Sequence, residues 1–302
     1  MTNMGVSTHA IISCMLGRLI DGNAVSASLR SKLITRVSTL KENGTSPCLA
    51  TILVGNDPAS SLYVQNKQKA AKQVGLATQD HRLEDNLHEN ELALLIDSLN
   101  NDPDVHGILV QLPLPKNINE FDIINKINPC KDVDGLTSIN SGLLLHGKAV
   151  LKPCTPSGIM ELLDYYNIEI KSQNAIIVNR SILVGKPLAF LLLERDATVT
   201  ICHSKSANLG SLLLGADIII TAIGDRDKFI LKAEMVKENA VVIDVGTNRK
   251  SGKLLGDVDF ESVREKASWI TPVPGGVGPM TIAMLLSNTV TAAAALNPSL
   301  TS

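Results

Sequence analysis

Few aromatic residues, no strong charge imbalance and no paired cysteine motif mark this chain of 302 residues. Phe, Trp and Tyr make up 3% of it and the net charge is −2, so no nucleic-acid surface is expected. No apolar run has the length of a bilayer span, so no membrane contact is expected. The five cysteines are scattered without a Cys-x-x-Cys, which is typical of reduced thiols in a cytoplasmic protein.

The N-terminal stretch does not have the order of a secretory signal. Residues 1–17 are mildly apolar, but their first positive charge comes only afterwards, at Arg18. We expect these residues to form a disordered or loosely packed extension. The remaining length, with 44% hydrophobic residues overall, suffices for two domains that each have a core.

Two successive sets of alternating strands and helices follow. The first set has strands at 48–54, 76–83 and 107–112, with helices at 22–44, 60–75, 88–100 and 119–127. The second set has strands at 175–178, 198–202, 217–223 and 240–245, with helices at 187–195, 208–214 and 231–237. This alternation predicts parallel sheets with crossover helices. Pro153 and Pro156 mark the break between the sets, and Thr155 or Ser157 is expected to cap the helix that starts there.

The chain therefore predicts two α/β domains with a cleft between them. We place the first at residues 1–152 and the second, a Rossmann-type dinucleotide-binding domain, at 153–279. The last, largely apolar helix, about 280–302, is expected to pack back onto the first domain.

The helix at 60–75 carries the most informative lysine. Residues three and four apart share a helix face, so Tyr63, Lys67, Ala70 and Val74 form one stripe that should face inward. Burial disfavours the charged form of a lysine, and a neutral amine is a competent general base. The alternative is that Lys67 reaches the surface along the edge of the stripe.

A second candidate site lies between the strand at 175–178 and the following helix. Strand-to-helix turns of this kind bind the pyrophosphate of a dinucleotide, although here Asn179-x-Ser181 replaces the usual glycine pattern. The next strand ends without the acid that typically binds the ribose of NAD, and it offers Ser204 while the turn offers Arg180. Hydroxyls and cations favour the ribose phosphate of NADP. The alternative is an ordinary, solvated basic turn.

Polar groups also follow the strand at 107–112. Gln111 ends this strand, where ligand sites of parallel sheets lie, unless it only caps the strand end. Asp132 and Asp134 lie in a glycine-containing loop and suit the amino-pyrimidine edge of a ligand, or form an Asx turn. No histidine is near in sequence and no calcium-loop pattern is present, so no metal site is predicted.

The segment 271–281 concentrates prolines and glycines ahead of the last helix. Proline fixes the backbone and glycine allows close approach to a ligand. Pro274, Gly275 and Gly276 are therefore predicted to form a wall of the substrate site.

Together these motifs resemble one family, the bifunctional methylenetetrahydrofolate dehydrogenase/cyclohydrolases (FolD). The resemblance runs from about Ile20 to the end of the chain. The motifs that carry it are Tyr-x-x-x-Lys-x-Lys-Ala-Ala (63–71), Val-Gln-Leu-Pro-Leu-Pro (110–115), Lys-Asp-Val-Asp-Gly-Leu (131–136), Pro-Cys-Thr-Pro-Ser-Gly (153–158), Arg-Ser-x-x-Val-Gly-x-Pro (180–187) and Pro-Gly-Gly-Val-Gly-Pro-Met-Thr (274–281).

The resemblance implies two reactions in one cleft. Methylenetetrahydrofolate is oxidised with NADP to the methenyl cation, and water then opens that ring to give 10-formyltetrahydrofolate. It implies that Lys67 is the key catalytic residue, that Tyr63 packs on the folate, that Gln111 tunes the lysine and that Asp134 binds the pterin. It also implies a homodimer formed through the cofactor domain.

Two positions depart from the family pattern. Asn179 stands where the family usually has glycine, so a side chain is expected near the pyrophosphate and cofactor affinity comes into question. Asn tolerates a positive φ better than most residues, so the turn is expected to survive. Thr247, a further candidate for the cofactor site, stands where many members have isoleucine.

Two other classes of protein share part of this pattern. Short-chain dehydrogenases also use Tyr-x-x-x-Lys, but there the pair follows the dinucleotide fold, whereas Lys67 precedes Arg180. A folate-binding protein of the same fold with weakened turnover is the second alternative, and Asn179 is the feature that favours it.

Overall fold

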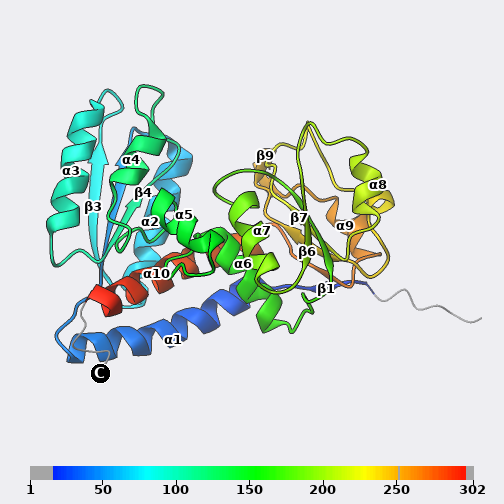
Figure 1. The fold of residues 1–302 in the computed structure, drawn as a ribbon, viewed down its shortest axis with the longest axis horizontal. Coiled ribbons are helices and arrows are strands. Elements are labelled where there is room, and N and C mark those ends of the chain that lie inside the picture. Colours follow the sequence, from blue (N-terminus) through cyan, green and yellow to red (C-terminus); the bar gives the residue numbers. More distant parts are fainter. Residues whose placement is uncertain (1–15, 251, 297–302) are drawn as a thin grey trace, which may run out of the picture.

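The computed structural model describes residues 16–250 and 252–296. The expectation for the N-terminal extension therefore falls mostly outside the described residues. Within them the chain forms two parallel sheets and one two-stranded hairpin, and Figure 1 shows the parallel sheets in separate lobes joined by long helices below.

The first lobe is a three-stranded parallel sheet in the order β3-β2-β4. Its central strand is buried at every residue, because helices cover both faces of a parallel sheet. The strands are β2 (Cys48–Val54), β3 (Ala77–Leu83) and β4 (Gly107–Val110), and the helices that follow them in turn are α2 (Pro58–Gln73), α3 (Glu89–Asn101) and α4 (Glu120–Lys126).

The second lobe is a six-stranded parallel sheet in the order β1-β11-β8-β7-β5-β6. Its strands are β1 (Arg18–Leu19), β5 (Asn174–Val178), β6 (Thr198–Cys202), β7 (Ile218–Thr221), β8 (Val241–Asp244) and β11 (Trp269–Ile270). Its helices are α6 (Cys154–Tyr165), α7 (Gly185–Leu193), α8 (Leu209–Leu213) and α9 (Phe260–Arg264). The chain runs from β5 out to β6 and then returns to β7, so the order reverses beside β5. Dinucleotides bind at such a reversal, beyond the carboxyl ends of the strands. The predicted fold class is confirmed.

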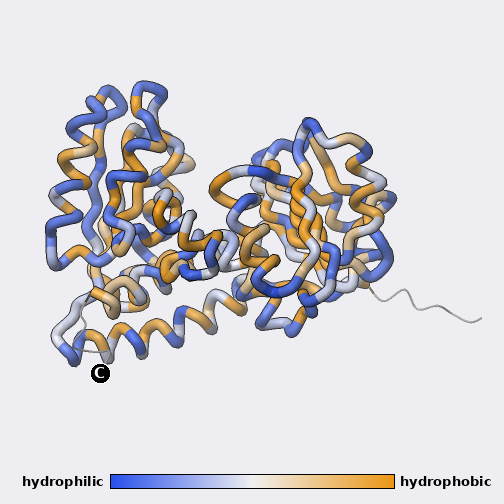
Figure 2. The backbone as a smooth tube through the Cα atoms, viewed as in Figure 1, coloured by the Kyte–Doolittle hydropathy of each residue, from blue (hydrophilic) through white to orange (hydrophobic). Residues whose placement is uncertain are grey.

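Long helices connect the lobes. Helices α1 (Gly22–Glu42) and α10 (Val277–Leu296) lie side by side below the first lobe in Figure 1 and run toward the second, and α10 also packs on α6. Figure 2 shows the inner strands of both lobes as mainly hydrophobic, whereas the edge strand β3 and the outer loops are mainly hydrophilic. A short helix between the lobes, α5 (Ser138–Leu145), has no counterpart in the sequence prediction. The short strands expected between residues 245 and 269 form a hairpin, β9 (Asn248–Lys250) with β10 (Lys253–Leu255).

Three local expectations are corrected. Helix α10 has the length and hydropathy of a membrane span, contrary to the expectation that no segment does, although half of its most apolar window is buried inside the protein. The helix expected at 231–237 is only a 3-10 turn, Ala233–Met235, because Leu231 is buried and bridges to Val258. Helix α6 has no side-chain cap, since the Thr155 hydroxyl pairs with Thr281 instead.

Candidate active site

Helix α2 positions Lys67 beside the end of strand β4. The helix begins where Pro58 supplies a preset φ and the Asp57 carboxylate accepts the Ser60 N–H (2.7 Å), and it ends before Gly75, whose φ is +85°. Its buried side includes Val64, Lys67, Ala70 and Ala71. Lys67 is thus only 8% exposed, as its place on the stripe predicts.

Gln111 meets this lysine directly. Its backbone N–H donates to Ile52 O (2.8 Å) and its side-chain amide donates to Leu112 O (2.7 Å), which fixes the direction of the carboxamide. The Lys67 Nζ then donates to Gln111 Oε1 at 3.0 Å. One acceptor therefore holds the amine, and the remaining Nζ positions are left for a ligand or water.

Asp132 and Asp134 have different surroundings although they are two residues apart. Asp132 accepts hydrogen bonds from Leu136 N (3.2 Å), Thr137 N (2.8 Å) and the Asn140 amide (2.9 Å). Both Asp132 oxygens therefore accept hydrogen bonds from the fold, and the residue stabilises the loop as the Asx-turn alternative predicts.

Asp134 is the carboxylate that lies near the amine. Burial is the main cause that raises its pKa, while the charge of Lys67 opposes this shift and the Asp132 charge adds to it. Its side chain also meets the Cys154 thiol, whose pKa burial raises well above the usual value. The structure thus brings together Lys67, Gln111 and Asp134.

Tyr63 lies on the same helix but is 44% exposed, so it stands at the rim of this group. The expectation of an inward tyrosine is corrected, because the buried side of α2 is centred on Val64 and Lys67, one residue further round. An exposed ring one turn before Lys67 is free to contact a ligand.

The turn after β5 forms a second group. The Asn179 Oδ1 accepts from Ser181 N (2.7 Å), Ser181 Oγ (2.7 Å) and Gly185 N (3.0 Å), and its amide donates to Ala222 O (2.5 Å). Asn179 does not have a positive φ, so the turn survives without the conformation that the family's glycine at this position suggested. Its side chain instead caps α7 and ties this turn to β7.

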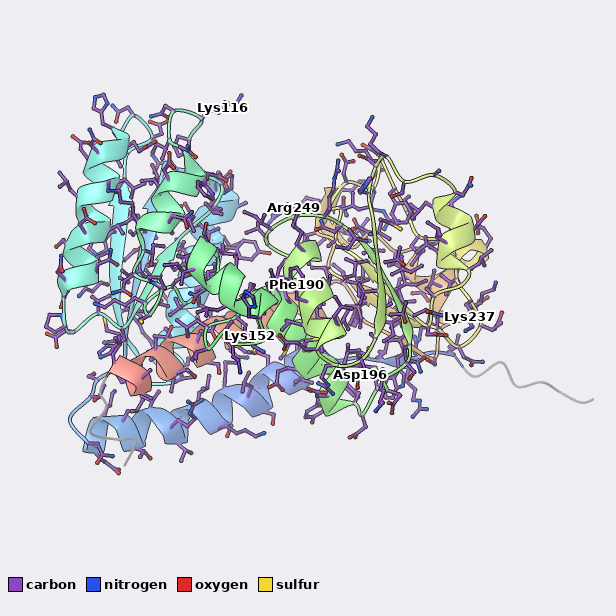
Figure 3. The ribbon with its side chains drawn as sticks, in the orientation of Figure 1. Lys116, Lys152, Phe190, Asp196, Lys237 and Arg249 are labelled. Carbon is purple, nitrogen blue, oxygen red and sulfur yellow. The ribbon has the colours of Figure 1, made fainter. Side chains whose placement is uncertain are left out.

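The other predicted cofactor contacts lie at the same carboxyl edge of the larger sheet. Arg180, Ser204 and Thr247 are all exposed, on the loops after β5, β6 and β8. Exposed cationic and hydroxyl groups without an acid at the end of β6 fit a phosphorylated ribose. Figure 3 shows Arg249, from the start of the hairpin, extending from this lobe toward the other.

The loop 274–276 is held by the start of α1. Asn23 N donates to Gly275 O (3.2 Å), and a Cβ on Gly22 would overlap the Gly276 carbonyl. Gly275 has a φ of +104°, which explains a glycine there. The predicted wall is therefore a braced segment of backbone.

One positioning residue was missed in the sequence. Asn288, buried in α10, donates to Val133 O (2.8 Å) and Lys152 O (2.9 Å), which holds the Asp134 loop against the helix. Figure 3 labels Lys152 on the segment between the lobes. An asparagine within a long apolar helix was the available signal.

The larger sheet has a reversal point, and on the other lobe a lysine held by a carboxamide lies near a half-buried carboxylate. These features define the class: a dinucleotide-binding enzyme with a candidate acid–base group on a separate lobe. Residues 20–134 match the family described as "Tetrahydrofolate dehydrogenase/cyclohydrolase, catalytic domain", and residues 153–297 match its NAD(P)-binding domain. The chain belongs to this family, which includes the FolD proteins.

Relatives with high coverage support this assignment. The "Bifunctional protein FolD" of Cenarchaeum symbiosum is 57% identical over 274 residues, covering 91% of this chain and 97% of the relative. The crystal structure of the Campylobacter jejuni FolD enzyme has a TM-score of 0.89 at 48% identity and covers 91% and 98% of the two chains. The Trypanosoma brucei FolD structure, complexed with NADP and an inhibitor, has a TM-score of 0.87 at 37% identity, with coverages of 92% and 97%.

Proposed function

We propose that this protein oxidises 5,10-methylenetetrahydrofolate with NADP and hydrolyses the resulting methenyl compound to 10-formyltetrahydrofolate. Bifunctional relatives above 50% identity support both activities. The observation that carries the hydrolytic assignment is the buried Lys67 Nζ, held by a single acceptor on Gln111.

In the proposed hydrolysis, Lys67 takes a proton from the water that attacks the methenyl carbon. A cationic substrate next to the amine favours its neutral form, because like charges repel. Gln111 keeps the amine oriented, Asp134 accepts hydrogen bonds from the amino-pyrimidine edge of the pterin, and Tyr63 packs against the folate at the rim. The C–N bond to the pterin-ring nitrogen then breaks, that nitrogen takes the proton held by Lys67, and the new hydroxyl group loses its proton to water as the formyl C=O forms.

We place the cofactor on the second lobe. When bound, NADP supplies a hydride acceptor. Asn179, Ser181 and Thr247 would order the loops around it, and Arg180 with Ser204 would bind the ribose phosphate. Pro274, Gly275 and Gly276 would line the folate from the opposite side, in a cleft shared by both reactions.

The domain boundaries we propose remain 1–152 and 153–279, with the last helix returning to the first domain. Strand β1 joins the larger sheet and α10 contacts α1, α2, β2 and β4, so the chain crosses between the lobes at both ends.

We infer a cytoplasmic homodimer that uses neither nucleic acid nor a membrane. The four described cysteines are free, which suits a reducing compartment. Strand β6 is an edge of the larger sheet, with Ile201 37% exposed, and edge strands offer unpaired backbone groups for a second copy. Sedimentation of wild type and an Ile201→Lys variant tests this, and a wild-type monomer would contradict it.

A spectroscopic assay separates this function from a folate-binding protein without turnover. Purified protein with methylenetetrahydrofolate and NADP should form NADPH, and added methenyltetrahydrofolate should lose its absorbance without any cofactor. Tight folate binding with neither change would favour the binding protein.

A further inference from the structure

Two fully buried carboxylates lie beneath the loops of the larger sheet, and the reaction proposed above does not use them. Asp244 ends β8 and is 3% exposed, and Asp257 follows β10 and is 0% exposed. Buried charges are normally paired with a cation or saturated by hydrogen bonds. Among the described residues, both carboxylates are hydrogen-bonded by donors, which are mostly backbone N–H groups.

Asp257 holds the loop that follows β7. One of its oxygens accepts from Ile223 N (2.6 Å), both accept from Gly224 N (3.0 and 3.2 Å), and Oδ1 also accepts from the Asn248 amide (3.1 Å). Ala222, just before this loop, accepts the Asn179 amide from the turn after β5. The Asp257 carboxylate therefore connects the loops on the two strands that flank the reversal point of the sheet.

Asp244 in turn holds the backbone around Asp257. It accepts from Asp257 N (2.9 Å), Val258 N (2.9 Å) and Gly246 N (3.0 Å), the last of which anchors the loop that carries Thr247. Burial raises the pKa of Asp244 to about 6, and backbone hydrogen bonds from Asp257 and Val258 oppose this shift.

The glycines around the pair show how closely the loops approach these oxygens. A Cβ on Gly246 would overlap the Asp257 carboxylate, and a Cβ on Gly256 would overlap that of Asp244. A side chain at either position would therefore displace one of the carboxylates from the network.

We propose that Asp257 is a positioning residue of the cofactor site, which sets the backbone of residues 222–224 and 246–248 for the dinucleotide, and that Asp244 fixes Asp257. This inference rests on the proposed function, since it concerns the site of its cofactor. Both carboxylates are buried and would act through the backbone they hold rather than through their own contact with a ligand.

The test is Asp257→Asn, because an amide places a donor against N–H groups that need an acceptor. Loss of one such bond predicts a KM for NADP raised about tenfold. Hydrolysis of methenyltetrahydrofolate without cofactor should keep its kcat and KM within about twofold, because Lys67 lies on the other lobe. Asp259→Asn is the matched control, since Asp259 is exposed and two residues away, and it should leave both activities unchanged.

A KM for NADP within twofold of wild type would overturn the proposal, even if the variant were less stable. KM does not depend on the folded fraction, so this readout separates positioning from support of the fold. Should Asp257→Asn fail to fold, Asn248→Ala removes one donor to the same oxygen and should raise the KM for NADP two- to fivefold. An unchanged KM in that variant would then overturn the proposal. Wild type without either activity would instead refute the proposed function.

Discussion

Lys67 and Lys131 are both buried beside the three-stranded sheet, with 8% and 5% of their surface exposed. The Lys131 Nζ donates to two backbone carbonyls at the end of α3, Leu99 O (3.1 Å) and Asp102 O (2.7 Å). Within the part of the chain that the structure describes, the Lys67 Nζ donates only to the Gln111 side chain. Burial lowers the pKa of Lys131, yet its donors are committed to the fold. Burial alone therefore does not mark a catalytic lysine, and donors left unused by the fold do.

Replacing each lysine by methionine should separate the two roles. Lys67→Met should lower the hydrolysis rate by about 1,000-fold, because the base is lost, with little change in stability. Lys131→Met should leave the rate of folded protein unchanged and lower the free energy of unfolding by about 2 kcal/mol, since two carbonyls lose their donor. Steady-state kinetics and urea unfolding measure both. If Lys67→Met and Lys131→Met lowered the hydrolysis rate equally, the two lysines would not have the different roles assigned to them.

Asp244 is a buried carboxylate that, like Lys131, serves the fold. Its raised pKa makes the free energy of unfolding depend on pH. Its pKa of about 6 lies above the unfolded value, so the folded protein binds the extra proton between about pH 4 and 6. The contribution of Asp244 to the free energy of unfolding is therefore fully present below the pKa of the unfolded state, and it is lost as the pH rises through about 6. Between pH 4 and pH 7, urea unfolding should show the free energy of unfolding of wild type falling by about 3 kcal/mol relative to that of Asp244→Asn. A difference in the free energy of unfolding between the two proteins that does not change with pH would refute this prediction.

Asp134 and Asp132 sharpen the comparison within one loop. Asp134→Asn should lower kcat/KM for the folate about 10- to 100-fold, because an acceptor for the pterin is lost while the fold keeps its bonds. Asp132→Asn should mainly reduce stability, since its oxygens serve Leu136, Thr137 and Asn140. Kinetics and thermal unfolding of both variants test this, and the reverse assignment of effects would count against it.

The smallest expected effect concerns Arg180. Arg180→Ala should raise the KM for NADP about tenfold and that for NAD much less, because only NADP has the ribose phosphate. Dehydrogenase assays with both cofactors measure the ratio. Equal losses for the two cofactors would remove the argument for phosphate recognition.

Sequence patterns predicted the alternating fold and the inward face of α2, because both depend on local hydrophobic periodicity. Periodicity did not distinguish Asp132 from Asp134, which only the family resemblance singled out, since the bonds of Asp132 depend on donors at the start of α5, a short helix without a clear pattern. Nor did it predict the internal role of the Asn179 side chain, which needs the distant Ala222 carbonyl. Hydrophobic periodicity does not predict hydrogen bonds between residues that are far apart in the sequence.

The central claim, that Lys67 acts as a neutral base, is tested most directly by chemical rescue of Lys67→Ala with added methylamine. Hydrolysis of methenyltetrahydrofolate should recover with the concentration of the free amine as the pH is raised at constant total methylamine. Recovery that follows the ammonium form instead would contradict the claim and assign the lysine a cationic role.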